Sequence, residues 1–535
     1  MAFRLISLAL FFTLLFSALG LKLYKLQIEK SAEYIERAHA QQEILKELEF
    51  RRGQFFFTDK NNANISVAFN KDYPVIYASP EDIEDVEFFA EKVSSALGLD
   101  RVKLAEDIKK SVSKRFKPIV EKATDEQVNR IRDLKIKGIY DNVKQYRFYP
   151  SYELGAHVLG FVGVNEYYSE PTGLYGAEKY FSEDLVSGKD IKLTIDRVIQ
   201  ARAEQVIDEL VKKFEAVGGT VIVQDPKTGK ILAMVSKPSF DPNNYNNFPL
   251  GSFQNPAVQY VYEPGSVFKP LTMAAGIDTG AFTTSTTFID TGSVTLNGKT
   301  IKNWDNKAHG KVTMTNVIER SINTGAVFAE QKIGNSKFLE YLKKFGFGEK
   351  TNIDLPDEVY GSLKNIERKE VRAIDFATAS YGQGTSVTPV QLITAFSSLA
   401  NGGLLMRPFI NSELKPYVVR RVIEEKTASQ VVGMMEFAVE KAGVATIPGF
   451  RIVGKTGTAF VPDFVKGGYS EEFIHSYVGF APVTDPKFVI LIKLDKPKAE
   501  LAGMTVVPAF KDLAQYILNY LNAAPDKLEI NDNKK

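Results

Sequence analysis

Two residues, Ser266 and Lys269, have the types and the spacing that covalent catalysis requires. They are three positions apart, so on a helix they share one face about one turn apart. The lysine amine could then take the serine hydroxyl proton directly, with no histidine. Pro270 follows, and it fits only the first turn of a helix because it lacks an N–H. The spacing therefore predicts a nucleophilic serine at a helix N-terminus, where free backbone N–H groups favour developing negative charge.

A second candidate segment is Ser321-Ile322-Asn323, which follows Ser266 by 55 residues. The Ser321 hydroxyl can relay protons, and the Asn323 amide can orient a substrate amide. Taken alone, each of these segments has a structural explanation: Ser321-x-Asn323 could end a helix, and Ser266 could cap one. A functional interpretation therefore depends on a third element.

That third element is Lys455-Thr456-Gly457-Thr458. Lys455 adds positive charge, the hydroxyls of Thr456 and Thr458 can hold a carboxylate, and Gly457 leaves room for a close backbone approach. The order S-x-x-K, then S-x-N, then K-T-G resembles the signature of penicillin-recognising serine acyltransferases. The three segments together favour catalysis far more strongly than any one of them.

A competing pattern overlaps the third element, because residues 449–456 match the phosphate-binding pattern G-x-x-x-x-G-K-[ST]. A phosphate cradle needs a flexible glycine loop that opens a helix. Here the interior positions, residues 450–453, are Phe, Arg, Ile and Val, which prefer an extended chain, and Pro462 follows soon after. We therefore interpret the segment as a strand that carries Lys455 and reject a nucleotide site.

Three other classes of catalytic site are not supported. No G-x-S-x-G nucleophile elbow occurs, and Ser266 already has a nearer base in Lys269. The chain has no cysteine, which excludes disulfides, thiol catalysis and thiolate metal sites. The four histidines are scattered and form no H-x-x-x-H or H-E-x-x-H motif, so no metal and no other cofactor is predicted.

Length and composition describe a folded protein of more than one domain. At 535 residues the chain exceeds one ordinary core, and its contents of 44% apolar and 25% charged residues are those of a globular protein. The net charge of +2, from 67 Lys+Arg and 65 Asp+Glu, gives no electrostatic reason to expect nucleic acid as a partner.

The N-terminus predicts export. Leu5–Leu21 is a run of 17 uncharged residues after Arg4, and as a helix it would span about 25 Å, close to the thickness of a bilayer core. One interpretation is an uncleaved signal anchor, and the other is a signal peptide cut after Gly20, with Ala18 at the small −3 position. We favour the anchor because the apolar pattern continues past Gly20. Either places the rest of the chain outside the membrane.

The next region is predicted to be a small α+β module without chemistry of its own. Residues 22–50 have the pattern of a helical stalk, and strands are expected between residues 53 and 77. Ser79 is predicted to cap a helix that has Pro80 at its first position. Thr124-Asp125-Glu126-Gln127 predicts a capping box.

A change of pattern near Ala216 predicts a domain boundary. Thr194–Phe214 has the periodicity of an amphipathic helix, whereas residues 218–235 predict a β-hairpin. Further strands are expected at Ser476–Ala481 and Phe488–Leu494, before a final helix at Val507–Leu521 and a disordered polar tail.

Beyond its three catalytic segments, the chain resembles the class B penicillin-binding proteins, which are monofunctional peptidoglycan D,D-transpeptidases. Arg51-Arg52-Gly53 with Asp59-Lys60-Asn61 is similar to an early family motif, and Lys60 replaces its usual arginine. Ala177 replaces the usual Leu or Ile of a later one. The other similar segments are 147–150, 156–160, 176–178, 225–229, 381–384, 387–392, 400–403 and 478–482.

The resemblance implies an α+β fold, an antiparallel sheet flanked by helices, on an elongated N-terminal pedestal with one transmembrane helix. The implied organisation is a transmembrane signal anchor at 1–22, a stalk and non-catalytic dimerisation-type pedestal at 23–215, a transpeptidase domain at 216–522 and a tail at 523–535. The implied location is the bacterial cytoplasmic membrane with the catalytic domain on its outer side.

The resemblance also implies the chemistry. The substrate would be the D-Ala-D-Ala end of a peptidoglycan stem peptide, and Ser266 would form an acyl-enzyme that an amine of a neighbouring stem resolves. The backbone N–H groups of Ser266 and Thr458 would form the oxyanion hole. β-Lactams would acylate Ser266 as mimics of the same dipeptide.

Within the family, Tyr262–Ser266 and Val478–Pro486 are more similar to the division type than to the elongation type. This type implies a membrane glycan polymerase and other division proteins as partners. Two alternatives remain open: a β-lactamase or D,D-carboxypeptidase, in which water accepts the acyl group, and a non-catalytic β-lactam sensor or division scaffold.

Overall fold

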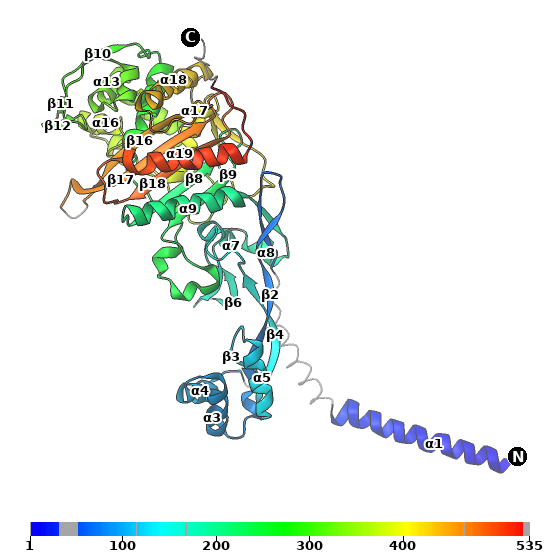
Figure 1. Ribbon diagram of the computed structural model, residues 1–535. Coiled ribbons are helices and arrows are strands. Elements are labelled where there is room, and N and C mark those ends of the chain that lie inside the picture. The colour runs from blue at the N-terminus through cyan, green and yellow to red at the C-terminus, as the bar shows by residue number, and fades with distance from the viewer. Residues whose placement is uncertain (1, 31–51, 114, 166–167, 464–465, 528–535) are drawn as a thin grey trace, which may run out of the picture. The chain divides into compact units, whose positions relative to one another are not determined.

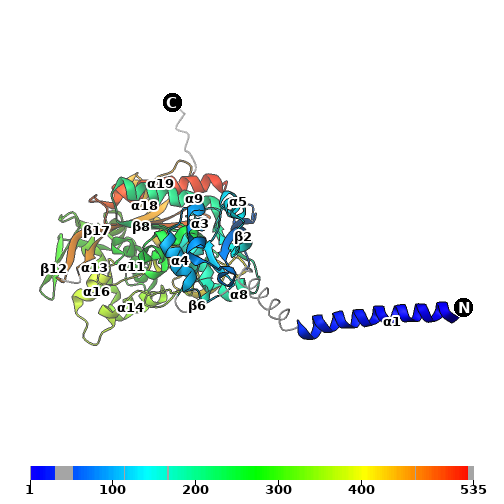
Figure 2. The same cartoon turned by 90° about the horizontal axis from the view of Figure 1, so that it is seen from below.

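The computed structural model describes residues 2–30, 52–113, 115–165, 168–463 and 466–527 (Figures 1 and 2). The chain divides into two compact units. The first comprises Met1–Arg52 and Phe69–Phe148, and the second comprises Gly53–Ala68 and Tyr149–Lys535. The predicted helical stalk falls mostly on residues 31–51, outside the described residues.

The N-terminal helix is α1, Ala2–Tyr24, and a short π-helical turn, η1, Lys25–Glu29, follows it. Within α1, Ile6–Tyr24 is long and apolar enough to cross a membrane, with a mean hydropathy of 2.0, and it is the one such helix among the described residues. Its side chains are exposed throughout the described part of the helix. This composition is what an anchor requires, because an exposed apolar helix needs a non-aqueous environment.

The rest of the first unit is a small α+β module. Its sheet places β2 between β3 and β4, both antiparallel to it. Helices α3, α4 and α5 bury an apolar cluster against this sheet, in which Phe89, Val93 and Ile131 are almost fully enclosed. The elements are β2 (Ile65–Ala78), which belongs to this unit from Phe69 onward, η2 (Pro80–Asp82), α3 (Val86–Leu97), α4 (Arg101–Lys109), β3 (Lys117–Val120), α5 (Asp125–Leu134) and β4 (Ile139–Phe148).

One predicted helix start in this module is confirmed and one is wrong. Thr124 and Gln127 form the reciprocal capping box of α5. Ser79 makes no side-chain cap, and Pro80 opens only the three-residue turn η2. The longer helix α3 begins later, where Asp85 accepts hydrogen bonds from two backbone N–H groups, because a carboxylate can satisfy two free donors of the first turn.

The second unit is built on a fully antiparallel sheet of order β16-β17-β18-β8-β9. Side chains alternate between its faces. Val221 and Val223 of β8 lie in one apolar cluster, whereas Ile222 lies in the other. The strands are β8 (Gly218–Gln224), β9 (Ile231–Lys237), β16 (Val453–Pro462), β17 (Tyr469–Ala481) and β18 (Phe488–Asp495). The predicted hairpin and the two predicted late strands are therefore confirmed.

Helices cover both faces of this sheet, as Figures 1 and 2 show. Helices α9 (Arg197–Lys213) and α19 (Ala502–Tyr520) pack on one face. The strands contact α10, η5, α17 and α18 on the other face, and further helices pack beyond these. The elements on this side are α10 (Pro256–Gln259), η5 (Gly265–Phe268), α11 (Lys269–Asp278), α12 (Met314–Glu319), α13 (Asn323–Ile333), α14 (Asn335–Lys344), α15 (Lys364–Glu367), α16 (Ala373–Ala379), α17 (Pro389–Ala400) and α18 (Glu425–Ala442). This is the predicted α+β architecture.

Shorter elements complete the second unit. They are β1 (Phe55–Thr58), α6 (Ala156–Leu159), β5 (Val162–Asn165), β6 (Tyr168–Gly173), α7 (Gly176–Tyr180), α8 (Ser182–Val186), β7 (Ile191–Asp196), η3 (Pro242–Asn247), η4 (Leu250–Phe253), β10 (Thr287–Asp290), β11 (Ser293–Leu296), β12 (Lys299–Lys302), β13 (Gly310–Thr313), β14 (Leu404–Met406) and β15 (Val418–Arg421).

Two expectations at element ends need correction. The helix predicted at Thr194–Phe214 begins only at Arg197, because Asp196 caps it and the residues before it form β7 beside β1. The tail predicted to be disordered is ordered as far as it is described. The Asp526 carboxylate accepts hydrogen bonds from the N–H groups of Arg451 and Thr484, at 2.8 and 3.0 Å, so it joins two separate segments.

Candidate active site

Ser266 and Lys269 lie one turn apart, as their spacing predicts. Ser266 sits in η5, and Lys269 begins α11, with Pro270 in the first turn where its missing N–H is harmless. Lys269 Nζ lies 3.0 Å from Ser266 Oγ. This is a hydrogen-bond distance, so the amine can take the hydroxyl proton without any intervening group.

Lys269 is fully buried and is surrounded by acceptors. Its Nζ also donates to the Ser321 carbonyl oxygen at 2.6 Å and to Asn323 Oδ1 at 2.8 Å, and it lies 3.1 Å from Ser321 Oγ. Burial, and then the positive charge of Lys455, hold the pKa of Lys269 well below its usual value. A lowered pKa favours the neutral amine, which is the form that can act as a general base.

Ser321 joins the two lysines. It lies in the connection between α12 and α13, and Lys455 Nζ donates to its Oγ at 3.0 Å. Its φ of 56° is in the left-handed region, which is unusual for serine and costs of order 1–3 kcal/mol. Strain of this kind persists only where the surroundings hold the residue in place.

Lys455 reaches the site from β16, the edge strand of the sheet. Burial lowers the pKa of Lys455 to about 7. Its Nζ contacts the carbonyl oxygen of Thr456 at 3.1 Å and Thr456 Oγ1 at 3.3 Å. The edge position matters because, among the described residues, β16 pairs with a strand on one side only, and an extended peptide can add to the other side of an edge strand.

Gly457 is required by packing. A Cβ at this position would stand 2.5 Å from Ser476 Oγ and 2.9 Å from the carbonyl oxygen of Pro264, which would push β16 away from the residues before Ser266. The Thr458 hydroxyl, expected to hold a carboxylate, accepts a long 3.4 Å hydrogen bond from the N–H of Ala502 at the start of α19.

The phosphate-cradle pattern at residues 449–456 does not form a cradle. Residues 453–462 are strand β16, paired antiparallel with β17, and the chain continues after Lys455 as this strand and not as a helix. The predicted strand is therefore confirmed, and the segment lacks the loop-to-helix geometry of a phosphate cradle.

The segment 381–384, noted for its family resemblance, lies directly behind the nucleophile. The N–H of Gly265 donates to the carbonyl oxygen of Gly382 at 3.0 Å, and a Cβ on Gly382 would come within 2.3 Å of the Gly265 carbonyl oxygen. Glycine at 382 has a φ of 79° and brings its backbone against the turn that presents Ser266.

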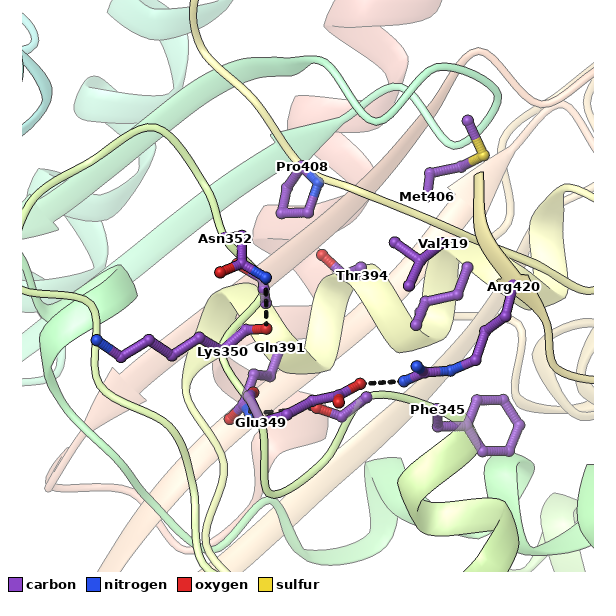
Figure 3. A pocket seen from close by; sticks show the side chains of 13 residues that line it. Phe345, Glu349, Lys350, Asn352, Gln391, Thr394, Met406, Pro408, Val419 and Arg420 are labelled. Atoms are coloured by element: carbon purple, nitrogen blue, oxygen red, sulfur yellow. Dashed lines mark hydrogen bonds and ion pairs between the residues drawn. The ribbon is translucent and has the colours of Figure 1, made fainter. Parts of the chain in front are cut away.

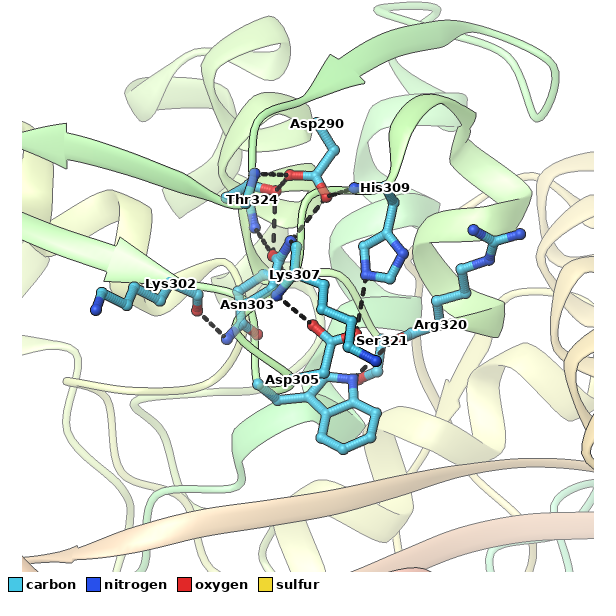
Figure 4. A network of polar contacts seen from close by, with 12 residues as sticks. Asp290, Lys302, Asn303, Asp305, Lys307, His309, Arg320, Ser321 and Thr324 are labelled. Carbon is cyan, nitrogen blue, oxygen red and sulfur yellow. Dashed lines mark hydrogen bonds and ion pairs between the residues drawn. The ribbon is translucent and has the colours of Figure 1, made fainter.

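Sequence reasoning missed a buried network behind Asn323 (Figure 4). Asp290 and Asn303 are almost fully buried and connect by hydrogen bonds to Thr324, the residue after Asn323. The segment of Asn303 lies 20 residues earlier in the sequence, and no local pattern links it to α13. The one unusual feature of this segment in the sequence is Trp304, the single tryptophan of the chain, which directly follows Asn303.

One cavity of the described structure lies away from these residues. It measures about 250 Å³ and lies between α17 and the β14–β15 pair, with Thr394 and Arg420 in its lining (Figure 3). Arg420 is already occupied, because it donates to the carbonyl oxygens of Lys343 and Lys344 and pairs with Glu349. None of the predicted catalytic residues lines this cavity.

Comparison with known families finds two matches. Residues 219–515 match the penicillin binding protein transpeptidase domain, and residues 51–234 match the penicillin-binding protein dimerisation domain. The two matched ranges overlap across the β8–β9 hairpin.

Curated relatives cover most of the chain. Stage V sporulation protein D of Bacillus subtilis is 31% identical over 521 residues, which cover 88% of this chain and 79% of that protein. Peptidoglycan D,D-transpeptidase FtsI of Escherichia coli K12 is 28% identical, over 89% of this chain and 85% of that protein. The FtsI homolog of Mesostigma viride is 29% identical, over 94% and 93%.

The family match spans more than half of the chain, and the site described above contains all three of its catalytic segments within hydrogen-bond reach of one another. The chain therefore belongs to the penicillin-binding protein transpeptidase family, among the monofunctional class B members.

Proposed function

We propose that the chain is a peptidoglycan D,D-transpeptidase that cross-links stem peptides through an acyl-enzyme on Ser266 and is acylated there by β-lactams. The observation that carries this proposal is the position of Lys269 Nζ, 3.0 Å from Ser266 Oγ, in a fully buried setting that favours the neutral amine. The relatives named for this activity match over most of their length, which supports the same assignment.

In the first half-reaction, neutral Lys269 takes the hydroxyl proton of Ser266 as Oγ attacks the carbonyl carbon of the penultimate D-Ala. The backbone N–H groups of Ser266 and Thr458 stabilise the oxyanion. The carbon–nitrogen bond to the terminal D-Ala then breaks, and the leaving amine receives the proton from Lys269 through the Ser321 hydroxyl, 3.1 Å away.

In the second half-reaction, an amine of a neighbouring stem attacks the acyl-enzyme carbonyl. Its nitrogen loses a proton to the same relay, the new amide bond forms, and the bond to Ser266 Oγ breaks as that oxygen regains a proton. Asn323 orients the substrate amide, because its Oδ1 is fixed on Lys269 at 2.8 Å. Lys455, with Thr456 and Thr458, holds the terminal carboxylate of the donor stem.

The location and the domain division belong to the same proposal. Helix α1 anchors the chain in the cytoplasmic membrane, and the catalytic unit works on the outer side, where peptidoglycan lies. The pedestal ends and the transpeptidase domain begins near residue 216, just before residue 219, where the transpeptidase match starts. Division is the favoured role, with a membrane glycan polymerase and other division proteins as partners, and the FtsI relatives support it.

The decisive experiment labels the detergent-solubilised full-length chain with fluorescent penicillin. Wild type is expected to form a covalent adduct, and Ser266→Ala is expected to form none. Ser293→Ala is the matched control, because Ser293 is exposed on β11, and it should label like wild type. Equal labelling of wild type and Ser266→Ala would exclude the acyl-enzyme, and no labelling of either would favour a non-catalytic role.

The acceptor of the acyl group is tested separately. Incubation with a pentapeptide stem and an amine-bearing acceptor stem should give a cross-linked dimer and free D-Ala. Release of D-Ala without a dimer would show a carboxypeptidase, and rapid spontaneous loss of the penicillin adduct would show a β-lactamase.

A further inference from the structure

The N-terminus of α13, which carries Asn323, is capped from a distant part of the chain. Its own N-cap residue, Ile322, makes no side-chain cap. Instead Asn303 Oδ1 accepts hydrogen bonds from the N–H groups of Asn323 and Thr324, at 3.1 and 3.2 Å. These are two of the donors that a helix leaves free at its start, so Asn303 does the work of a cap from 20 residues away.

The orientation of the Asn303 amide is itself fixed. Its Nδ2 donates to Asp290 Oδ2 at 2.8 Å and to the carbonyl oxygen of Lys307 at 3.0 Å. Reversal of the amide would place its NH₂ group against the helix N–H groups and its oxygen against two acceptors. Asp290 therefore determines which atom of Asn303 faces α13.

Asp290 is built into the core as a carboxylate. It is 1% exposed, and it accepts hydrogen bonds from Thr324 Oγ1 at 2.7 Å and from the N–H groups of Gly292 and His309 at 2.9 Å each, in addition to Asn303 (Figure 4). Burial favours the neutral acid, but these hydrogen bonds outweigh burial and lower the pKa of Asp290. A negative charge at this point also suits the N-terminus of a helix.

The neighbours of Asn303 contact the same loop. The carbonyl oxygen of Lys302 accepts from Asn323 Nδ2 at 2.9 Å, which leaves Oδ1 of that amide for Lys269. Trp304 Nε1 donates to the carbonyl oxygen of Arg320 at 2.9 Å, immediately before Ser321. Three consecutive residues, Lys302 to Trp304, therefore hold the loop of residues 320–324 on both sides of the strained Ser321.

We propose that Asp290 and Asn303 are positioning residues for acylation: through the segment 302–304, named here the clamp, they fix Ser321 and Asn323 against Lys269. Both residues are buried, so they act through the clamp and not by contact with substrate. The proposal rests on the proposed function for its catalytic consequence. Its structural part, that the clamp holds the loop of residues 320–324, is independent of the proposed function.

The test compares two variants, Asp290→Asn and Asn303→Ala, called here the clamp variants because both change the hydrogen bonds of Asn303, with wild type in the detergent-solubilised full-length chain. Asp290→Asn replaces an acceptor by a donor group in the centre of the network, and Asn303→Ala removes the remote cap. The limiting rate of β-lactam acylation is expected to fall roughly 10- to 100-fold, because small displacements of catalytic groups have effects of this order. The pre-acylation dissociation constant should change little, and the pH at which acylation is half-maximal should shift, because Asn323 helps to set the surroundings of Lys269.

Asp354→Asn is the matched control. Asp354 is also buried, 4% exposed, and accepts two backbone hydrogen bonds of 2.7 Å from Ile410 and Asn411, but it contacts none of the catalytic residues. The control is expected to lower thermal stability and to leave the limiting rate and its pH profile unchanged. Wild-type acylation rates in both clamp variants would overturn the proposal, as would a control that loses rate and shifts its pH profile equally.

Trp304 provides a readout that does not depend on catalysis. It is the only tryptophan of the chain, so its fluorescence reports on the clamp. Both clamp variants should shift its emission to longer wavelength and increase its quenching by acrylamide, and Asp354→Asn should do neither. If wild type forms no Ser266-dependent adduct, the proposed function fails, but Trp304 fluorescence still tests whether the clamp holds the loop of residues 320–324. Unchanged quenching in both variants would then overturn it.

Discussion

The first unit and the catalytic site differ in where their charged side chains lie and in how these are paired. In the first unit, ion pairs such as Lys109–Glu87 and Arg130–Glu126 join side chains that are more than half exposed, and the buried cluster is apolar. In the catalytic site, Lys269 and Lys455 are both buried, and no carboxylate pairs with either among the described contacts.

The difference shows what the charged side chains contribute in each region. Exposed ion pairs contribute little to stability, so the fold of the first unit depends on its apolar cluster. Two buried lysines without a counter-ion are unfavourable for folding, and their value lies in the lowered pKa that burial produces. The comparison predicts that changes in the site alter chemistry and that changes in the first unit alter stability alone.

The largest effect should follow from Lys269→Met, which keeps the bulk of the side chain and removes its amine. The rate of acylation by a β-lactam is expected to fall roughly 10²- to 10⁴-fold, the range for the loss of a general base. Stopped-flow measurement on the full-length chain would test this. Lys179→Met is the control, because Lys179 forms an exposed ion pair with Asp357, and its rate should equal that of wild type.

The second effect concerns the first unit. Phe89 is 2% exposed in the apolar cluster, whereas its neighbour Phe88 is 51% exposed. Phe89→Ala should lower the free energy of unfolding of this unit by about 3–5 kcal/mol, and Phe88→Ala should change it far less. Urea unfolding gives the stabilities. A large loss of acylation rate in folded Phe89→Ala protein would contradict the separation of roles.

The catalytic elements could be predicted from the sequence because their signals are local. Pro270 marks the first turn of α11, and the extended preference of residues 450–453 marks β16. Thr124 and Gln127 are close enough in sequence to form a recognisable capping box. In each case the residues that determine the structure lie within one turn or one strand of each other.

The clamp could not be predicted, because its partners are distant in sequence. Asp290, Asn303 and Thr324 meet only after β10, β12 and α13 have packed, and each alone resembles an ordinary turn or cap residue. The start of α9 was misplaced for a related reason. Thr194 and Ile195 fit the helical period, but β-branched residues also favour strands, and pairing with a neighbouring strand decided the outcome.

The third effect is the pH dependence of acylation. Lys269 acts as a base only when it is deprotonated, so the rate should fall about tenfold per unit as pH falls below its lowered pKa. Lys455 holds a carboxylate only when it is protonated, so the rate should also fall as pH rises above about 7. Lys455→Arg keeps its charge at all these pH values and should abolish the alkaline fall alone. If the rate of Lys455→Arg still falls at alkaline pH as in wild type, a group other than Lys455 causes that fall.

The smallest effect tests the exposed charges of the first unit. Glu106 and Lys110 form an i, i+4 pair at 2.8 Å on α4, and their side chains are 58% and 75% exposed. Glu106→Gln should lower the free energy of unfolding by only about 0.3–0.5 kcal/mol, because water and side-chain entropy offset most of the attraction. The difference should disappear in about 1 M salt, where screening acts over roughly 3 Å. A salt-resistant loss several times larger would mean that this pair stabilises the unit as buried contacts do, and the contrast between the two regions would then be one of degree.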